Sequence, residues 1–128
     1  MILLDTHAWL WWCADRKKIP SSTVRKLARE KELFVSAISA WEVCVLVKKG
    51  RLRLRDEPRV ALRALIDAEG IRMIAVTDAI AVEAALLPET FHGDPADRLI
   101  TATAIQFGAT LVTKDTAIAD TKMIRTTW

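Results

Sequence analysis

Five carboxylates in this chain are spaced so that they could share one site. Asp5 directly follows an apolar run, and Asp115 follows another in "LVTKD". Glu42 lies near the start of a helical pattern in "ISAWE", and Asp94 and Asp97 flank a proline in "GDPAD". If the two apolar runs are neighbouring parallel strands, Asp5 and Asp115 meet at one sheet edge. Glu42 and Asp97 can reach the same edge from helix N-termini.

Such a cluster implies a bound cation. Two like charges about 4 Å apart repel by roughly 4 kcal/mol at an effective dielectric near 20. Carboxylates that share a cleft therefore raise one another's pKa values or bind a cation. Oxygen donors suit Mg²⁺ or Mn²⁺, and the sequence has no Cys/His zinc set. One or two such ions can polarise a phosphoryl oxygen and activate water, which predicts phosphodiester hydrolysis.

Each acid alone also has a structural explanation. Asp5, Asp94 and Asp115 can each accept a helix N-cap hydrogen bond, and the proline after Asp94 suits a first helical position. Glu42 in a first helical turn would stabilise the macrodipole. Helix capping is the main role predicted for Asp94, and metal binding is the role predicted for Asp97.

Polar residues beside the acids carry weaker signals. Thr113 could hydrogen-bond the metal shell or a scissile phosphate, whereas Lys114 either pairs with phosphate or is a solvated surface lysine. His7 and His92 are isolated in the sequence. This isolation favours structural or supporting roles over direct metal ligation.

Strands and helices that could position these residues alternate along the chain. Short apolar runs predict strands over 2–4, 33–36, 71–76 and 110–113, with a weaker fifth over 123–126. Helical patterns cover 6–14, 24–31, 40–49, 58–68, 78–87 and 94–107. Ser39 is predicted to cap the helix over 40–49, and Gly108 to end the helix over 94–107.

This alternation predicts an α/β fold, a three-layer α/β/α arrangement around a central parallel sheet of four to five strands. Right-handed crossovers place the carboxyl ends of the strands along one edge, where open α/β sheets bind ligands. No repeat or linker divides the sequence, so residues 1–128 are expected to form one domain.

Composition favours a cytoplasmic protein without a membrane segment. No apolar stretch approaches the roughly 20 residues of a membrane span, and the first residues lack signal-peptide features.

Cys13 and Cys44 lie in apolar helical surroundings and are expected to be buried thiols. The net charge is +3, and seven basic residues between Lys48 and Arg63 predict a solvated face or a nucleic-acid contact.

Taken together, these segments resemble the PIN-domain ribonucleases, and within them the VapC-type toxins of prokaryotic toxin–antitoxin pairs. The likeness runs over nearly the whole chain, through "ILLDTHAWLWW", "ISAWEVCVLVKKGRL", "HGDPADRLITATA" and "LVTKD" in that order. The resemblance implies a PIN-like fold and a Mg²⁺- or Mn²⁺-dependent endoribonuclease. Single-stranded or looped RNA is the expected substrate because its bases and scissile bonds are accessible.

The resemblance also implies site residues and partners. The family's acidic set corresponds to Asp5, Glu42, Asp97 and Asp115, with Thr6, Asp94 and Thr113 at supporting positions. Of these, Asp5 and Asp97 are implied as the most direct metal ligands. Family members commonly form homodimers and are inhibited by a cognate antitoxin along the active-site groove. Its expected surface is Trp9, Trp12 and Trp41, although tryptophans at helical spacing are more often core residues. The basic stretch 48–63 could follow an RNA backbone.

Two other classes of protein are alternatives. A catalytically silent PIN-like module would bind RNA or a partner protein. A phosphate-accepting signalling domain also gathers acids at a sheet edge, but it needs paired acids near the first strand, where only Asp5 is present. Metal-dependent RNA cleavage would separate the ribonuclease from both.

Overall fold

A computed structural model describes residues 1–91 and 93–128 and contains one five-stranded parallel sheet. Its strands are β1 (Ile2–Leu4), β2 (Leu33–Ser36), β3 (Ile71–Ile74), β4 (Thr110–Val112) and β5 (Arg125–Thr127). The strand order is β3-β2-β1-β4-β5, and every pairing is parallel. The first and fourth strands are neighbours, so the condition under which Asp5 and Asp115 meet at one sheet edge is fulfilled.

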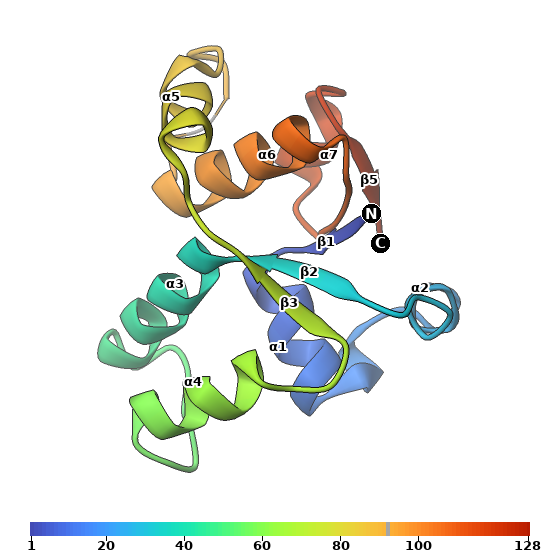
Figure 1. The fold of residues 1–128 in the computed structure, drawn as a ribbon, viewed down its shortest axis with the longest axis vertical. Helices are drawn as coiled ribbons and strands as arrows, with labels where there is room; N and C mark the ends of the chain where they lie inside the picture. Colours follow the sequence, from blue (N-terminus) through green and yellow to red (C-terminus); the bar gives the residue numbers. More distant parts are fainter. Residues whose placement is uncertain (92) are drawn as a thin grey trace.

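Helices cover both faces of this sheet (Figure 1). They are α1 (Thr6–Ala14), the short 3-10 helix η1 (Arg16–Lys18), α2 (Ser21–Leu27), α3 (Ala37–Lys48), α4 (Pro58–Ile66), α5 (Asp78–Leu86), α6 (Pro95–Phe107) and α7 (Thr116–Asp120). In Figure 1, α1, α3 and α4 lie on one side of the strands, and α5, α6 and α7 lie on the other. The predicted three-layer α/β/α architecture is confirmed.

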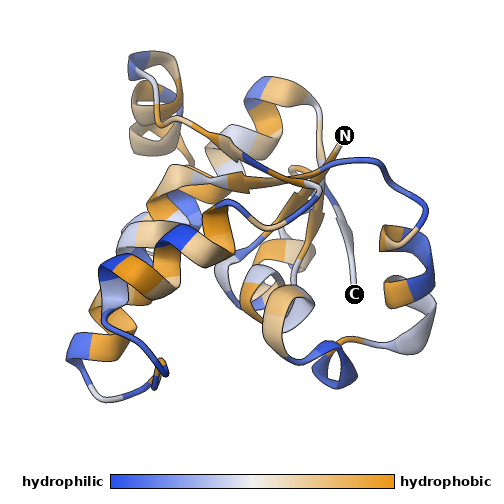
Figure 2. Ribbon diagram, turned by 60° about the horizontal axis from the view of Figure 1, so that its bottom comes forward, coloured by the Kyte–Doolittle hydropathy of each residue, from blue (hydrophilic) through white to orange (hydrophobic). Residues whose placement is uncertain are grey.

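The core is split in two by the sheet because successive strand side chains point to opposite faces. Leu4 packs with Trp9 of α1 in one cluster, whereas Leu3 packs with Ile100 of α6 in another. Leu3, Leu4 and Trp9 are all 0% exposed. In Figure 2 the central strands are mainly hydrophobic, and several connecting loops are hydrophilic.

The start of α3 differs from the prediction. Ser36, rather than Ser39, is the N-cap residue, and its side chain accepts a hydrogen bond from the Ile38 amide at 3.4 Å. The helix thus begins at Ala37, directly after β2, and Glu42 lies in its second turn instead of its first. The macrodipole explanation for Glu42 is therefore weaker than predicted, since that effect decays within one turn.

Other boundaries also shifted where tertiary packing overrides local pattern. Helix α2 covers Ser21–Leu27 rather than 24–31, β3 ends at Ile74, and β5 begins at Arg125. The sequence pattern did not predict η1 or α7, because both are too short to show a helical period. Gly108 does end α6 as predicted, in the left-handed conformation with φ +59°.

The two cysteines are free thiols, as expected, but both are half-buried rather than buried. Each lies at the edge of the core cluster around Trp9, so its side chain is only partly covered.

His92 lies outside the described residues, so its predicted supporting role is not addressed. Within residues 1–91 and 93–128, no helix has the length and apolar character needed to cross a membrane.

Candidate active site

The predicted acids meet in a cleft at the carboxyl ends of β1 and β4. After β1 the chain adds β2 and β3 next to one edge of that strand, and it then crosses back to add β4 and β5 next to the other edge. This change of direction creates a crevice between β1 and β4. A cavity of about 670 Å³ opens at this place. Its lining includes the five carboxylates predicted from sequence: Asp5, Glu42, Asp94, Asp97 and Asp115.

Asp5 is the most enclosed of these acids, with 8% of its surface exposed. Its Oδ1 accepts a hydrogen bond from the Ala8 amide at 2.7 Å, so it is also the N-cap of α1. Burial raises the pKa of Asp5, while hydrogen bonds from the Thr113 hydroxyl and the Ala8 amide oppose that rise. The capping explanation is correct and does not exclude a second role, because the cap uses only part of the carboxylate's acceptor capacity.

Asp94 and Asp97 enter the cleft from the start of α6. Asp94 is its N-cap, with Oδ1 accepting from the Asp97 amide at 3.0 Å, and Pro95 occupies the first helical position. Carboxylate oxygens of Glu42, Asp94 and Asp97 all lie within 4.8 Å of one another. The predicted capping role of Asp94 is confirmed, and the fold also brings Asp94 closer to Glu42 than sequence spacing indicated.

The acidic cluster changes the protonation of Asp97. Burial, followed by the neighbouring charges of Asp94, Glu42, Asp115 and Asp5 in that order, raises the pKa of Asp97 to about 7. A carboxyl group with such a pKa loses its proton more readily when a cation is bound beside it, because the positive charge stabilises the carboxylate. The arrangement can therefore exchange a proton for a divalent ion.

Asp115 approaches from the other strand and is tied to Asp5 through Thr113. Its Oδ1 accepts from the Ala117 amide at 2.8 Å, which makes it the N-cap of α7. The Asp115 amide donates to the Thr113 hydroxyl at 3.0 Å, and that hydroxyl bonds the Asp5 carboxylate. Thr113 thus connects the ends of β1 and β4 across the cleft.

Thr6 does not line the cavity, although the resemblance placed it beside the acids. It is 1% exposed, and its Oγ1 hydrogen-bonds the Ser39 hydroxyl at 2.9 Å. This buried bond joins the N-terminal ends of α1 and α3, next to Asp5 and one turn before Glu42. Sequence reasoning assigned Ser39 to a cap and missed this contact, because only the fold brings the two helices together.

We expect Ser39→Ala to lower the free energy of unfolding by about 1–3 kcal/mol, because it leaves the buried Thr6 hydroxyl without a partner. Urea denaturation measures the effect. The double variant Thr6→Val/Ser39→Ala should cost about 1 kcal/mol less than the sum of its single variants. Additive costs would contradict an energetic coupling between these hydroxyls.

Arg98 holds the segment that carries Asp94. Its guanidinium donates to the backbone oxygens of Ala84, Leu87 and Phe91 at 3.0–3.3 Å. These contacts connect the end of α5 to the approach of α6, so they position the acidic N-terminus of α6. The sequence pattern gave no signal for this role of Arg98, because an arginine on a helix is ordinarily a solvated surface residue.

The three tryptophans proposed as an antitoxin surface separate in the structure. Trp9 and Trp12 are buried, as the core alternative predicts, and Trp41 is 53% exposed. The expectation of a shared surface is wrong for the first two because their side chains fill the core cluster under β1. Trp11, which the prediction did not include, lines the acidic cleft.

Comparison with known proteins decides the family. Residues 2–123 match the PIN domain. The chain belongs to the PIN-domain family. This PIN domain is 40% identical over 114 residues to Ribonuclease VapC22 of Mycobacterium tuberculosis, covering 89% of this chain and 86% of that protein. The resemblance stated from the sequence motifs is confirmed.

Solved structures share the fold of this PIN domain. VapBC2 from Rickettsia felis, bound to a DNA fragment from its promoter, matches with a TM-score of 0.72 at 18% identity, covering 99% of this chain and 98% of that chain. DNA-bound VapBC from Salmonella typhimurium matches with a TM-score of 0.69 at 16% identity, covering 98% and 96%. At these identities the likeness supports the three-layer fold alone.

Proposed function

We propose that this PIN-domain protein is a divalent-metal-dependent endoribonuclease and the toxin of a toxin–antitoxin pair. One observation carries the proposal: five carboxylates line a single cleft at the carboxyl ends of β1 and β4. The relationship to a protein named as a ribonuclease supports the choice of RNA as substrate. We also propose that residues 1–128 fold as one domain, since one sheet includes strands from both ends of the chain.

The proposed catalytic and metal-binding residues are Asp5, Glu42, Asp97 and Asp115, and Asp94 joins them as a ligand as well as a cap. The oxygens of Glu42, Asp94 and Asp97 are near enough to one another to share an ion. Because every donor is a hard carboxylate oxygen, Mg²⁺ or Mn²⁺ fits the site better than Zn²⁺.

When bound, such an ion supplies Lewis-acid polarisation of a phosphoryl oxygen and lowers the pKa of an attacking water. The chain's own groups prepare the site for this chemistry. Asp97, whose raised pKa lets it hold a proton near neutrality, would release that proton to solvent when it acts as a ligand. Thr113 keeps the Asp5 carboxylate oriented through its hydroxyl. Lys114, which is exposed at the border of the cleft, can pair with the phosphate of the bound strand.

The proposed partners are an RNA substrate, a cognate antitoxin and a second copy of the chain, and the proposed location is the cytoplasm. The solved relatives are described as VapBC complexes, which supports an antitoxin partner. Trp41 on α3 and the apolar residues Val82 and Leu86 on α5 are exposed and offer surface for protein contacts.

We expect purified protein to cleave RNA with Mg²⁺ or Mn²⁺ and to lose that activity in EDTA, because carboxylates alone supply no Lewis acid. Electrophoresis of cleaved RNA measures the effect, and added Mn²⁺ should restore it. Cleavage that persists in EDTA would contradict the proposal.

Asp5→Asn tests the role of the Asp5 charge without removing the helix cap, since asparagine caps a helix as well as aspartate but carries no charge. This variant should fold and lose RNA cleavage. In cells, the wild type should slow growth when expressed without its partner, and Asp5→Asn should not. Equal toxicity of both forms would favour the catalytically silent alternative.

A further inference from the structure

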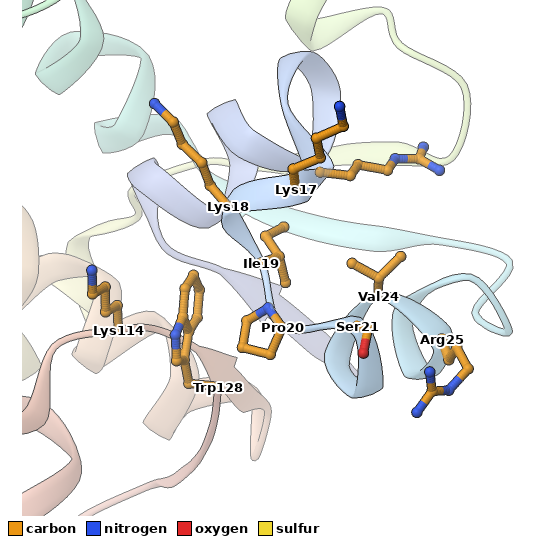
Figure 3. Close-up of a pocket in the computed structure, with 10 residues that line it drawn as sticks. Lys17, Lys18, Ile19, Pro20, Ser21, Val24, Arg25, Lys114 and Trp128 are labelled. Carbon is orange, nitrogen blue, oxygen red and sulfur yellow. The ribbon is translucent and has the colours of Figure 1, made fainter.

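A second cavity, strongly basic, lies beside the acidic cleft. It has a volume of about 670 Å³ and is formed by η1, the start of α2 and the end of β5. In Figure 3, Trp128 stands between Lys114 and Pro20, and Arg25 lies on the far side of Val24. We call this cavity the basic pocket. Its basic residues are Arg16, Lys17, Lys18, Arg25 and Lys114.

The basic pocket adjoins the acidic cleft. Lys114 lines both cavities and directly precedes Asp115. Trp11 lines the acidic cleft, and its ring lies 5.5 Å from the ring of Trp128, which lines the basic pocket. A flexible polymer bound at the acids would therefore meet Lys114 and the Trp128 ring first on its way to the pocket.

Charge distribution indicates that the pocket suits an anionic polymer. Lys17, Lys18 and Arg25 are exposed. The ion pairs found among residues 1–91 and 93–128 involve other basic residues, at Arg59, Arg63 and Arg72. Two of those three lie in the basic stretch 48–63, so part of that stretch is already neutralised, by Glu57 and Asp67. Electrostatic attraction for phosphates is thus available at the pocket.

The aromatic side chain narrows the choice of polymer. A half-buried indole at Trp128 offers a surface on which an unpaired base can stack, and base–aromatic stacking with a basic groove is typical of single-strand binding. A duplex keeps its bases stacked internally, and an acidic peptide has no base for this ring. Single-stranded RNA satisfies both features.

Resting on the ribonuclease function proposed above, we propose that RNA flanking the scissile bond runs past Lys114 into the basic pocket. Lys17, Lys18 and Arg25 neutralise its phosphates there, and one base stacks on Trp128. Arg16 has a different role, because its guanidinium lies over the Trp12 ring at 3.8 Å and its Nε donates to the Trp12 backbone oxygen. The pocket is therefore a binding site for nucleotides outside the reacting bond.

Fluorescence anisotropy with a short labelled single-stranded RNA tests the proposal in an Asp97→Asn background, which keeps the RNA intact. Lys17→Ala/Arg25→Ala should weaken binding about tenfold or more and reduce the slope of log affinity against log salt by about 1.4, or 0.7 for each lost phosphate contact. The matched control is Lys26→Ala/Arg29→Ala, which removes the same charge from exposed residues that line neither cavity. Equal losses in the two double variants would overturn the proposal.

Trp128 is tested in the same background. Trp128→Ala should weaken binding at least about fivefold and Trp128→Phe should restore most of it, because phenylalanine keeps an aromatic face. Thermal melts identify any variant that fails to fold. Unlabelled RNA should compete better than polyglutamate of equal charge. Equal competition, or no loss in Trp128→Ala, would overturn the base-stacking assignment.

The outcomes separate this inference from the function on which it rests. With Asp97 restored, Lys17→Ala/Arg25→Ala should raise KM for RNA cleavage about tenfold and change kcat less than about twofold, because Lys17 and Arg25 line the basic pocket and not the acidic cleft. Metal-dependent cleavage with an unchanged KM would overturn the basic pocket and leave the ribonuclease proposal standing. RNA binding that depends on the pocket, without any cleavage by the wild type, would overturn the ribonuclease proposal instead.

Discussion

Replacing Asp97 by asparagine is expected to abolish metal-dependent cleavage while making the metal-free protein more stable. The activity should fall at least about a hundredfold, because a metal ligand contributes several kcal/mol of transition-state stabilisation and each 1.36 kcal/mol is tenfold in rate. The stability should rise because burial disfavours the charge of Asp97 in the folded state, and the charges of Asp94, Glu42, Asp115 and Asp5 repel it. Opposite effects on activity and stability are typical of a strained functional site.

The stability gain should depend on pH. Folding raises the pKa of Asp97 from 3.8 to about 7, so the native chain binds more protons than the unfolded chain between those values. Stability from this group is therefore full at low pH and is lost as pH rises through 7. This rise in the pKa of Asp97 corresponds to roughly 4 kcal/mol of stability. We discount that figure to about 1–2 kcal/mol because Asp97 is partly exposed and screened by solvent. The wild type should approach the variant at about pH 5 and fall below it at about pH 8.

Thermal melts of metal-free protein measure this effect. Asp97→Asn should melt about 4–8 °C higher than the wild type at the alkaline end, and Mn²⁺ should stabilise the wild type more than the variant. Asp78→Asn is a suitable control, since Asp78 is exposed on α5 and does not line the cleft. It should change stability by less than about 0.5 kcal/mol. An Asp97→Asn variant that melts lower at every pH would contradict the repulsion argument.

Trp9→Ala is expected to be the most destabilising single substitution in the core cluster between α1 and the sheet. It should lower the free energy of unfolding by about 3–5 kcal/mol. Trp9 is 0% exposed and packs between α1 and the sheet, so truncation leaves a large cavity beneath β1. Urea denaturation should show a lower midpoint with an unchanged slope. A loss below about 1 kcal/mol would contradict a central role for this side chain.

Two further substitutions isolate the cause. Trp9→Phe should cost clearly less than Trp9→Ala, because it keeps an aromatic ring and removes an indole N–H that has no hydrogen-bond partner among residues 1–91 and 93–128. Trp41→Ala removes the same side chain from a 53% exposed position and should cost less than about 0.5 kcal/mol. Equal costs at positions 9 and 41 would show that burial does not set the effect.

Local pattern was sufficient for the features that depend on a few adjacent residues. In "GDPAD", an aspartate followed by proline predicted the start of α6, and the observed Asp94 cap agrees. Apolar runs ending at Asp5 and just before Asp115 predicted two strands that terminate at one sheet edge. The family resemblance then joined Asp5, Glu42, Asp97 and Asp115 into one set, and the fold brings all four to the same cleft.

Tertiary structure decided everything that depends on which surfaces meet. Trp9, Trp12 and Trp41 are alike in sequence, and only packing against the sheet separates buried from exposed. The approach of Asp94 to Glu42 and the bond between Thr6 and Ser39 join residues more than thirty positions apart. The basic pocket combines η1 with Trp128 from opposite ends of the chain. The Asp94 cap and the Gly108 stop of α6 follow from local hydrogen bonding and backbone preference, so the sequence alone determines them. The Ser36 cap and the ends of β3 and β5 were not predicted correctly from local pattern. A cavity, its charge and its neighbours follow from long-range packing, which a local pattern does not encode.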